Sequence, residues 1–281
     1  MSRLLKAFFY KLARDLTFRI TLFIGIGMAF FMALLYLIIG NGLPGGQTLC
    51  NGQSLLISSM SPAQNFGISV PINVCTFIVL EFTSGTIRNK IIAGNSKFKI
   101  YTSLFISSVV FGLSIMIVYA GLATLLGTIF GGFNADGIVI SMGGNSVYGT
   151  SSVSYIIKSI VLFILVFVTI CSMATFFSTL FRNIGPCIPC LIIIILFLSM
   201  FAMIINSMYG LSPDTFKELK PFYELSRYIN PFHGLVAPST NDAGVMDIDN
   251  TSFIASIISN LVFTTAFFAG GSAIFVKRDV K

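Results

Sequence analysis

The sequence predicts an all-α integral membrane protein with six transmembrane helices. Of its 281 residues, 55% are hydrophobic and 10% are charged, and the mean hydropathy is +0.92. Soluble domains contain about 25% charged residues, and a soluble chain this apolar could not cover its surface with polar groups. Six apolar stretches approach or exceed the roughly 20 residues that a helix needs to cross a bilayer. They lie at about residues 20–40, 66–82, 103–131, 153–180, 184–209 and 252–276.

We expect a single transmembrane domain over residues 1–281. The sequence shows no repeat long enough to indicate two fused halves. The apolar stretches are also longer than the alternating segments of about ten residues that form membrane barrels. The stretch at 66–82 is the shortest and contains Pro71, so its start is the least defined boundary.

The distribution of basic residues indicates the orientation of the chain. With six spans, 13 of the 17 Lys and Arg residues fall on the side of the N-terminus. The opposite side holds most of the acidic residues. Because cytoplasmic loops are enriched in Lys and Arg, we expect a multi-pass protein of the cell membrane with both termini in the cytoplasm. The net charge of +7 is therefore explained by orientation, and no nucleic acid partner is expected.

Residues 3–16 have the pattern of an amphipathic helix that precedes the first span. The apolar face would hold Leu5, Phe8, Phe9, Leu12 and Leu16. The opposite face would hold Arg3, Lys6, Lys11 and Arg14. We expect such a helix to lie in the headgroup plane with its apolar face in lipid. A simple extension of the first span is the alternative.

The connection at residues 83–102, between the second and third spans, predicts a short cytoplasmic helix. Gly85 and Gly94 bracket a segment of about two helical turns. Ile87 and Ile91 share one face of it because they are four residues apart. A short helix held between two spans is suited to pass force from a cytoplasmic partner into the membrane. A solvated basic loop would satisfy the charge rule equally well.

The segments predicted to lie outside differ from one another. Residues 41–65 and 132–152 lack a periodic apolar pattern, so we expect loops or short turns there. Residues 210–251 are too apolar for an exposed loop, and Pro221 and Pro231 interrupt them too often for a span. We expect short helices that re-enter the outer leaflet. A small cap packed on the spans is the alternative.

Motifs for chemistry on this chain are absent. No phosphate-binding Gly-x-x-x-x-Gly-Lys-Ser/Thr sequence is present, and a single histidine, His233, cannot form a metal cluster. Cys187 and Cys190 have the spacing of a redox or metal pair, but no histidine or second cysteine pair is near them in the sequence. We therefore expect no catalytic residue, cofactor or metal site, and an energy source on another chain.

The order of the predicted elements resembles the membrane subunit of a type-2 ABC exporter, a half-size permease. Glu81 followed by Gly85-Thr86-Ile87-Arg88-Asn89-Lys90 and Gly94-Asn95-Ser96-Lys97 is similar to the loop after the second span in that family. Pro231-Phe232-His233-Gly234 is similar to the segment before its last span. Within the family, the chain looks closest to permeases of antimicrobial-peptide and lantibiotic immunity exporters.

The resemblance implies a dimer of permeases, identical or related, each docked on a cytoplasmic ABC ATPase that binds ATP and Mg. This chain would then be a transport subunit and no enzyme. The residues expected to form or support the coupling helix are Glu81, Gly85, Thr86, Ile87, Arg88, Asn89, Lys90, Ile91, Gly94, Ser96 and Lys97. The rings expected to form an external gate are Phe216, Phe222, Tyr223, Tyr228 and Phe232.

Two further expectations concern the coupling residues. Ile87 and Ile91 would supply the apolar side of the ATPase contact. Glu81 would pair with a basic residue of the coupling loop or of the N-terminal helix, and interfacial solvation is its alternative role.

The cargo is expected to be amphipathic or hydrophobic, because the spans offer Phe, Ile, Ser, Thr and Gly surfaces with few fixed charges. A non-transport membrane anchor or sensor subunit, or a membrane-embedded enzyme, is the alternative function. Co-purification of an ATPase encoded in the same operon would separate these possibilities.

Overall fold

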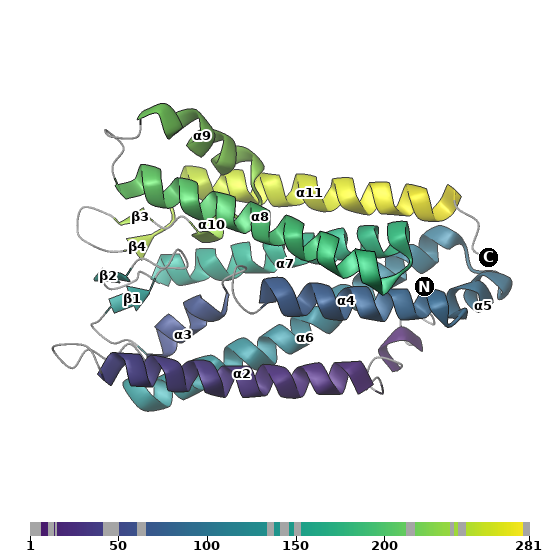
Figure 1. Cartoon of the computed structure of the whole chain (residues 1–281), viewed down its shortest axis with the longest axis horizontal. Coiled ribbons are helices and arrows are strands. Elements are labelled where there is room, and N and C mark those ends of the chain that lie inside the picture. Colours follow the sequence, from purple (N-terminus) through teal and green to yellow (C-terminus); the bar gives the residue numbers. More distant parts are fainter. Residues whose placement is uncertain are drawn as a thin grey trace.

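The computed structural model describes residues 7–10, 14, 16–41, 51–60, 66–133, 138–140, 146–148, 153–211, 217–236, 239–240 and 246–277. These residues form a bundle of long helices with two short antiparallel strand pairs at one end (Figure 1). The short helix α5 (Thr86–Ile92) lies at the other end, together with the first and last described residues. We refer to the two ends as the strand end and the α5 end.

Each predicted apolar stretch coincides with a helix of the bundle. The helices are α2 (Leu16–Asn41), α4 (Phe66–Thr83), α6 (Lys97–Gly131), α7 (Val153–Phe181), α8 (Ile184–Leu211) and α11 (Asn250–Lys277). Among the described residues, all except α4 are long and apolar enough to cross a membrane. The prediction of a helical, multi-pass membrane protein is therefore confirmed.

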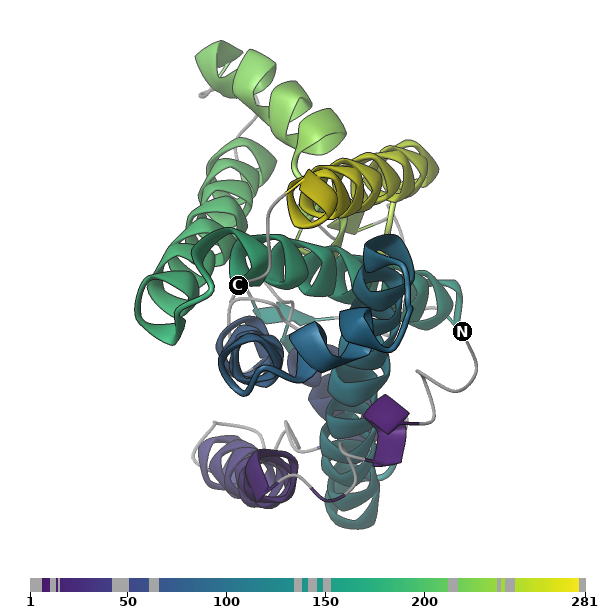
Figure 2. The ribbon, with the colours of Figure 1, turned by 90° about the vertical axis from the view of Figure 1, so that its right-hand side faces the viewer.

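Helix α7 forms the centre of the bundle. Figure 2 views the helices from the α5 end, with α7 between α11 on one side and α4 and α6 on the other. Helix α2 packs against α6 at the edge, and α8 packs against α4 and α7. A Cβ added to Gly112 of α6 would lie 2.3 Å from the ring of Phe167 in α7, so this glycine permits the close α6–α7 contact.

The prediction that residues 41–65 form only loop or turn structure is wrong in its second half, where Gly52–Ser59 form helix α3. The Asn51 side chain caps α3 by accepting a hydrogen bond from the backbone N–H of Ser54 at 2.7 Å. The backbone N–H of Gly52 donates to the carbonyl of Gly132 at 3.0 Å. Helix α3 is almost entirely buried against α6, because small residues let the two backbones approach closely.

Short strands occupy two of the segments predicted to lie outside. Strands β1 (Ile138–Ile140) and β2 (Ser146–Tyr148) form a hairpin within residues 132–152. Strands β3 (Ser239–Thr240) and β4 (Met246–Asp247) form a second pair before α11. A loop or short turn was expected at residues 132–152. The strands of this hairpin are too short to give a clear alternation of apolar and polar residues in the sequence.

The segment between α8 and α11 contains the short helices expected from its prolines. It includes a 3-10 turn, Lys217–Leu219, followed by α9 (Lys220–Ile229) and α10 (His233–Val236). Pro221 lies in the first turn of α9, where a missing N–H costs no helical hydrogen bond. We refer to residues 217–236 as the α9–α10 segment.

The tight α3–α6 contact can be tested with two glycines of the same helix. A Cβ at Gly127 would lie 2.7 Å from the backbone oxygen of Asn51, whereas a Cβ at Gly121 would meet no atom within 4 Å. Gly127→Ala should therefore lower the free energy of unfolding by about 1–3 kcal/mol. Gly121→Ala should leave it unchanged or slightly raised. Thermal unfolding in detergent measures both, and equal effects would contradict the described packing.

Candidate functional site

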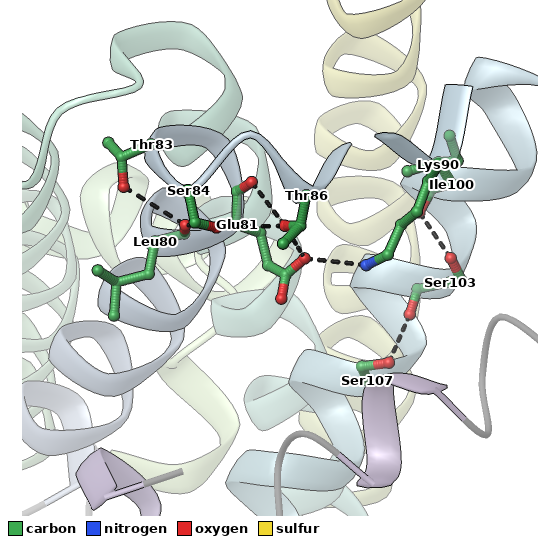
Figure 3. A network of polar contacts seen from close by, with 9 residues as sticks. All are labelled: Leu80, Glu81, Thr83, Ser84, Thr86, Lys90, Ile100, Ser103 and Ser107. Atoms are coloured by element: carbon green, nitrogen blue, oxygen red, sulfur yellow. Dashed lines mark hydrogen bonds and ion pairs between the residues drawn. The ribbon is translucent and has the colours of Figure 1, made fainter. Parts of the chain in front are cut away.

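A fully buried carboxylate lies at the α5 end of α4. The side chain of Glu81 is completely shielded from solvent by the rest of the chain. Its Oε2 atom accepts a hydrogen bond from the ammonium of Lys90 at 2.9 Å and lies 2.6 Å from the hydroxyl of Thr86 (Figure 3). The Thr86 hydroxyl also lies 2.9 Å from the Glu81 carbonyl oxygen. One acidic side chain thus connects the end of α4 to both ends of α5.

The local sequence explains this arrangement. Gly85 adopts a left-handed backbone conformation, with a φ of 69°, which turns the chain out of α4 and into α5. Thr86 and Lys90 are four residues apart and so lie on one face of α5, toward Glu81. Gly94, with a φ of 84°, ends the segment before α6 begins. The short helix predicted between the two glycines is α5.

Lys90 also contacts the N-terminal region. Its ammonium lies 3.3 Å from the centroid of the Phe8 ring, close enough for a cation–π interaction. Phe8 is buried and packs edge-on against Phe77 of α4, with ring centroids 6.4 Å apart. The expectation that Phe8 faces lipid is therefore wrong, because its ring lies between α4 and the Lys90 ammonium.

Ile87 and Ile91 of α5 have different surroundings from those expected. Ile87 is completely buried in the protein core, and Ile91 is partly buried against the same core. The apolar side chain that α5 exposes is Ile92, at 73%. Arg88 and Asn89 are exposed. Ile87 therefore holds α5 on the bundle, and the surface that α5 offers consists of Arg88, Asn89 and Ile92.

The residues that follow α5 attach it to neighbouring helices. The side chain of Asn95 donates to the Lys90 carbonyl at 3.0 Å, and the Ser96 hydroxyl caps α6 by accepting from the backbone N–H of Lys99. The Lys97 ammonium donates to the Val276 carbonyl in the last turn of α11 at 3.0 Å. A cation at a helix C-terminus is favourable. The α4–α6 connection is thus fastened to α11 as well as to α4.

The strand end of the bundle contains a second polar site that sequence reasoning missed. The Asn230 side chain donates to the Leu198 carbonyl of α8 at 2.7 Å, and Asn260 of α11 donates to the Pro231 carbonyl at 2.9 Å. Leu198 lies 13 residues before the end of α8, and Asn260 lies ten residues after the start of α11. At about 1.5 Å per residue, the α9–α10 segment therefore reaches roughly 15–20 Å into the bundle.

Asn260 connects this segment to the central helix. Its side-chain oxygen accepts a hydrogen bond from Thr169 of α7 at 2.8 Å, and the Thr169 hydroxyl also lies 3.0 Å from that of Thr264. Asn260 and Thr169 are both buried. A lone asparagine inside an apolar stretch was the signal in the sequence, because such groups are costly in a membrane unless they have partners.

The structure describes four of the five rings expected to form a gate and places them in different surroundings. Phe222 and Tyr228 of α9 are 50% and 58% exposed. The Tyr223 ring contacts that of Tyr209 in α8 at a tilt, with centroids 4.7 Å apart. Phe232 is completely buried in the core. Phe216 lies outside the described residues.

His233 is buried beside Phe232. Its Nδ1 atom lies 3.1 Å from the hydroxyl of Ser226, and its ring meets Tyr223 edge to face with centroids 5.2 Å apart.

Ion pairs hold the residues that lead into α11. Lys158 of α7 pairs with Asp247 at 3.1 Å and donates to the Ile248 carbonyl at 2.7 Å. Arg227 of α9 pairs with Asp249. Hydrogen bonds from Thr251, with the Arg227 charge, lower the pKa of Asp249 below its usual value. The beginning of α11 is thus tied to both α7 and α9.

A family comparison matches residues 20–281 of the chain. The chain belongs to the DUF2705 family. This family is described as a protein of unknown function. No curated protein and no solved structure matches the chain. In the described part of this DUF2705 protein, no group of three or more His, Cys, Asp or Glu side chains is placed to hold a metal ion.

The effects of substituting Glu81 and Lys90 on the free energy of unfolding should be strongly non-additive. Lys90→Met leaves a fully buried carboxylate without its cation, which should cost about 3–5 kcal/mol. The double variant Glu81→Gln with Lys90→Met removes both charges and should recover most of that loss. Lys97→Met, a control near the surface, should cost less than about 1 kcal/mol. A double-mutant cycle followed by thermal unfolding measures these values. A loss of stability in Lys90→Met as small as that in Lys97→Met would contradict the pairing.

Proposed function

We propose that this protein is the permease subunit of an ATP-driven ABC exporter that moves an amphipathic or hydrophobic cargo across the cell membrane. It would act as a dimer with a second permease, identical or related. ATP and Mg would be bound by a separate cytoplasmic ATPase. The ATPase would dock on the surface formed by Arg88, Asn89 and Ile92.

The rigid attachment of α5 to α4 is the observation that carries this proposal. Glu81 is completely buried and holds Thr86 and Lys90, while Arg88 and Asn89 on the same short helix are exposed. A solvated basic loop has no use for a buried carboxylate, which is costly to desolvate. A helix that transmits force needs such an attachment, because a force on its exposed side must move α5 and the spanning helix α4 together.

The contact between Lys90 and Phe8 extends this coupling surface to the N-terminal region. In the proposed complex, residues 3–16 would lie beside α5 and touch the ATPase as well. Motion of α5 would then reach α4 through Glu81, α11 through Lys97 and the N-terminal region through Phe8.

The α9–α10 segment is proposed to close the outer end of the cargo path. Its depth in the bundle supports a pair of re-entrant helices, and the exposed rings of Phe222 and Tyr228 are available to a second permease or to cargo. Buried Phe232 and His233 would anchor the segment. The apolar outer surfaces of the spanning helices fit an amphipathic cargo better than a small ion.

Six spans, with α4 as the second, complete the proposal. The 18 residues of α4 measure about 27 Å at 1.5 Å per residue, close to the roughly 30 Å of a hydrocarbon core. Six crossings put both termini on the α5 side, where most basic residues of the sequence lie. The positive-inside rule makes that side the cytoplasm.

Cysteine labelling in intact cells tests this topology. A membrane-impermeant maleimide should modify a cysteine introduced by Ser146→Cys, in β2, and spare one introduced by Asn89→Cys, in α5. Both variants are compared with the unmodified protein, which carries five native cysteines. Labelling of Asn89→Cys from outside would overturn the six-span orientation.

The docking surface can be tested with two isoleucines of nearly equal exposure. Ile92 is 73% exposed on α5, and Ile129 is 74% exposed near the strand end of α6. Ile92→Asp should weaken binding of the ATPase encoded in the same operon by at least about tenfold, or 1.4 kcal/mol. Ile129→Asp should leave that binding unchanged. Affinity is measured with the purified proteins, and cargo-stimulated ATP hydrolysis should fall in parallel.

Two results would overturn the proposal. The ATPase could fail to bind the unaltered protein, which would favour an anchor, sensor or enzyme. Alternatively, both aspartate variants could bind as well as the unaltered protein, which would remove α5 as the docking site.

A further inference from the structure

Two cysteines from different helices meet inside the bundle. The sulfur atoms of Cys75 in α4 and Cys187 in α8 lie 3.2 Å apart, and both side chains are completely buried. Cys190, which has the spacing of a redox partner of Cys187 in the sequence, is only partly buried. The hydroxyl of Ser178 in α7 lies 3.5 Å from the Cys187 sulfur.

We propose that Cys75 and Cys187 are a modification site, at which a hydroperoxide forms a reversible disulfide between α4 and α8. A disulfide bond is about 2.05 Å long, so the sulfur atoms need to approach by little more than 1 Å. Rotation of the two side chains can supply this movement. Linear coordination of a metal ion between two thiolates would instead require the sulfurs to move apart.

Cys187 is placed to react first. It is the fourth residue of α8, and the N-terminus of a helix favours a thiolate. The Ser178 hydroxyl and the Cys75 thiol can both donate hydrogen bonds to that thiolate. Hydrogen peroxide is small and uncharged, so brief local opening admits it where a charged oxidant is excluded.

The reaction balances in two steps. The Cys187 thiolate attacks one peroxide oxygen, the O–O bond breaks, and the products are a sulfenic acid on Cys187 and, after protonation, water. The Cys75 sulfur then attacks the Cys187 sulfur and releases a second water. In total, two thiols and one hydrogen peroxide give one disulfide and two waters, and a dithiol reductant reverses the bond.

The disulfide would restrict the coupling helix. Cys75 lies six residues before Glu81 on α4, so a bond to α8 would fix the position of the helix that carries Glu81. Under oxidation, α5 could no longer move α4 relative to α8. This effect on transport rests on the proposed function, whereas formation of the bond does not.

The bond is tested by counting thiols in the full-length protein in nanodiscs. After treatment with hydrogen peroxide at low molar excess, the protein is denatured, alkylated with a maleimide and weighed intact. The unaltered protein has five cysteines and should retain three free thiols after oxidation, and five after reduction. Cys187→Ser should keep all four of its thiols, whereas Cys75→Ser should lose at most one, because oxidation of Cys187 then stops at the sulfenic acid. Cys171→Ser, which removes another buried thiol, should still lose two.

Each outcome decides one part of the proposal. Five free thiols after oxidation, or a loss of two that persists in Cys75→Ser, would overturn the disulfide site. If the bond forms, cargo-stimulated ATP hydrolysis of the complex should fall at least about tenfold and return on reduction. Unchanged hydrolysis with the bond present would overturn the regulatory part. Failure of the ATPase to bind the reduced protein would overturn the proposed function and leave the disulfide site standing.

Discussion

The charge on Glu81 constrains the whole α5 end of the protein. A carboxylate with no exposure is stable only if cations and donors surround it, and here both come from α5. The turn at Gly85, the common face of Thr86 and Lys90, and the burial of Ile87 all follow from keeping α5 folded back against α4. The Phe8 ring covers the far side of the Lys90 ammonium, so the N-terminal region takes part in the same arrangement.

At the strand end, neutral groups meet a similar constraint inside the bundle, in addition to the ion pair between Arg227 and Asp249. The chain from Ile229 to Pro231 leaves regular helix deep inside an apolar bundle, where backbone groups without partners are costly. Asn230, Ser259 and Asn260 donate side-chain hydrogen bonds to the carbonyls of Leu198, Ile229 and Pro231. A buried polar network whose members have partners positions a segment accurately.

The sequence predicted the helices better than their contacts. Apolar length and charge were enough for the six helices, and two glycines were enough for α5, because these features depend on local chemistry. Helix α3 was missed because its burial depends on small residues of α6 that lie far away in the sequence, among them Gly127. The role of Ile87 was misassigned because a two-turn helix does not reveal which face meets the bundle. Glu81 was expected to pair with a basic residue, but only the structure identifies Lys90 and adds Thr86 and Phe8.

Amide hydrogen exchange tests most directly whether Glu81 holds α5 on α4 as one body. In the unaltered protein, the amides of residues 89–93, which donate within α5 and its C-terminal cap, should exchange about as slowly as those in the last turns of α4. Glu81→Gln should speed exchange in α5 at least about tenfold and leave the middle of α4 unchanged. Rapid exchange of α5 in the unaltered protein, or no change in the variant, would contradict the account.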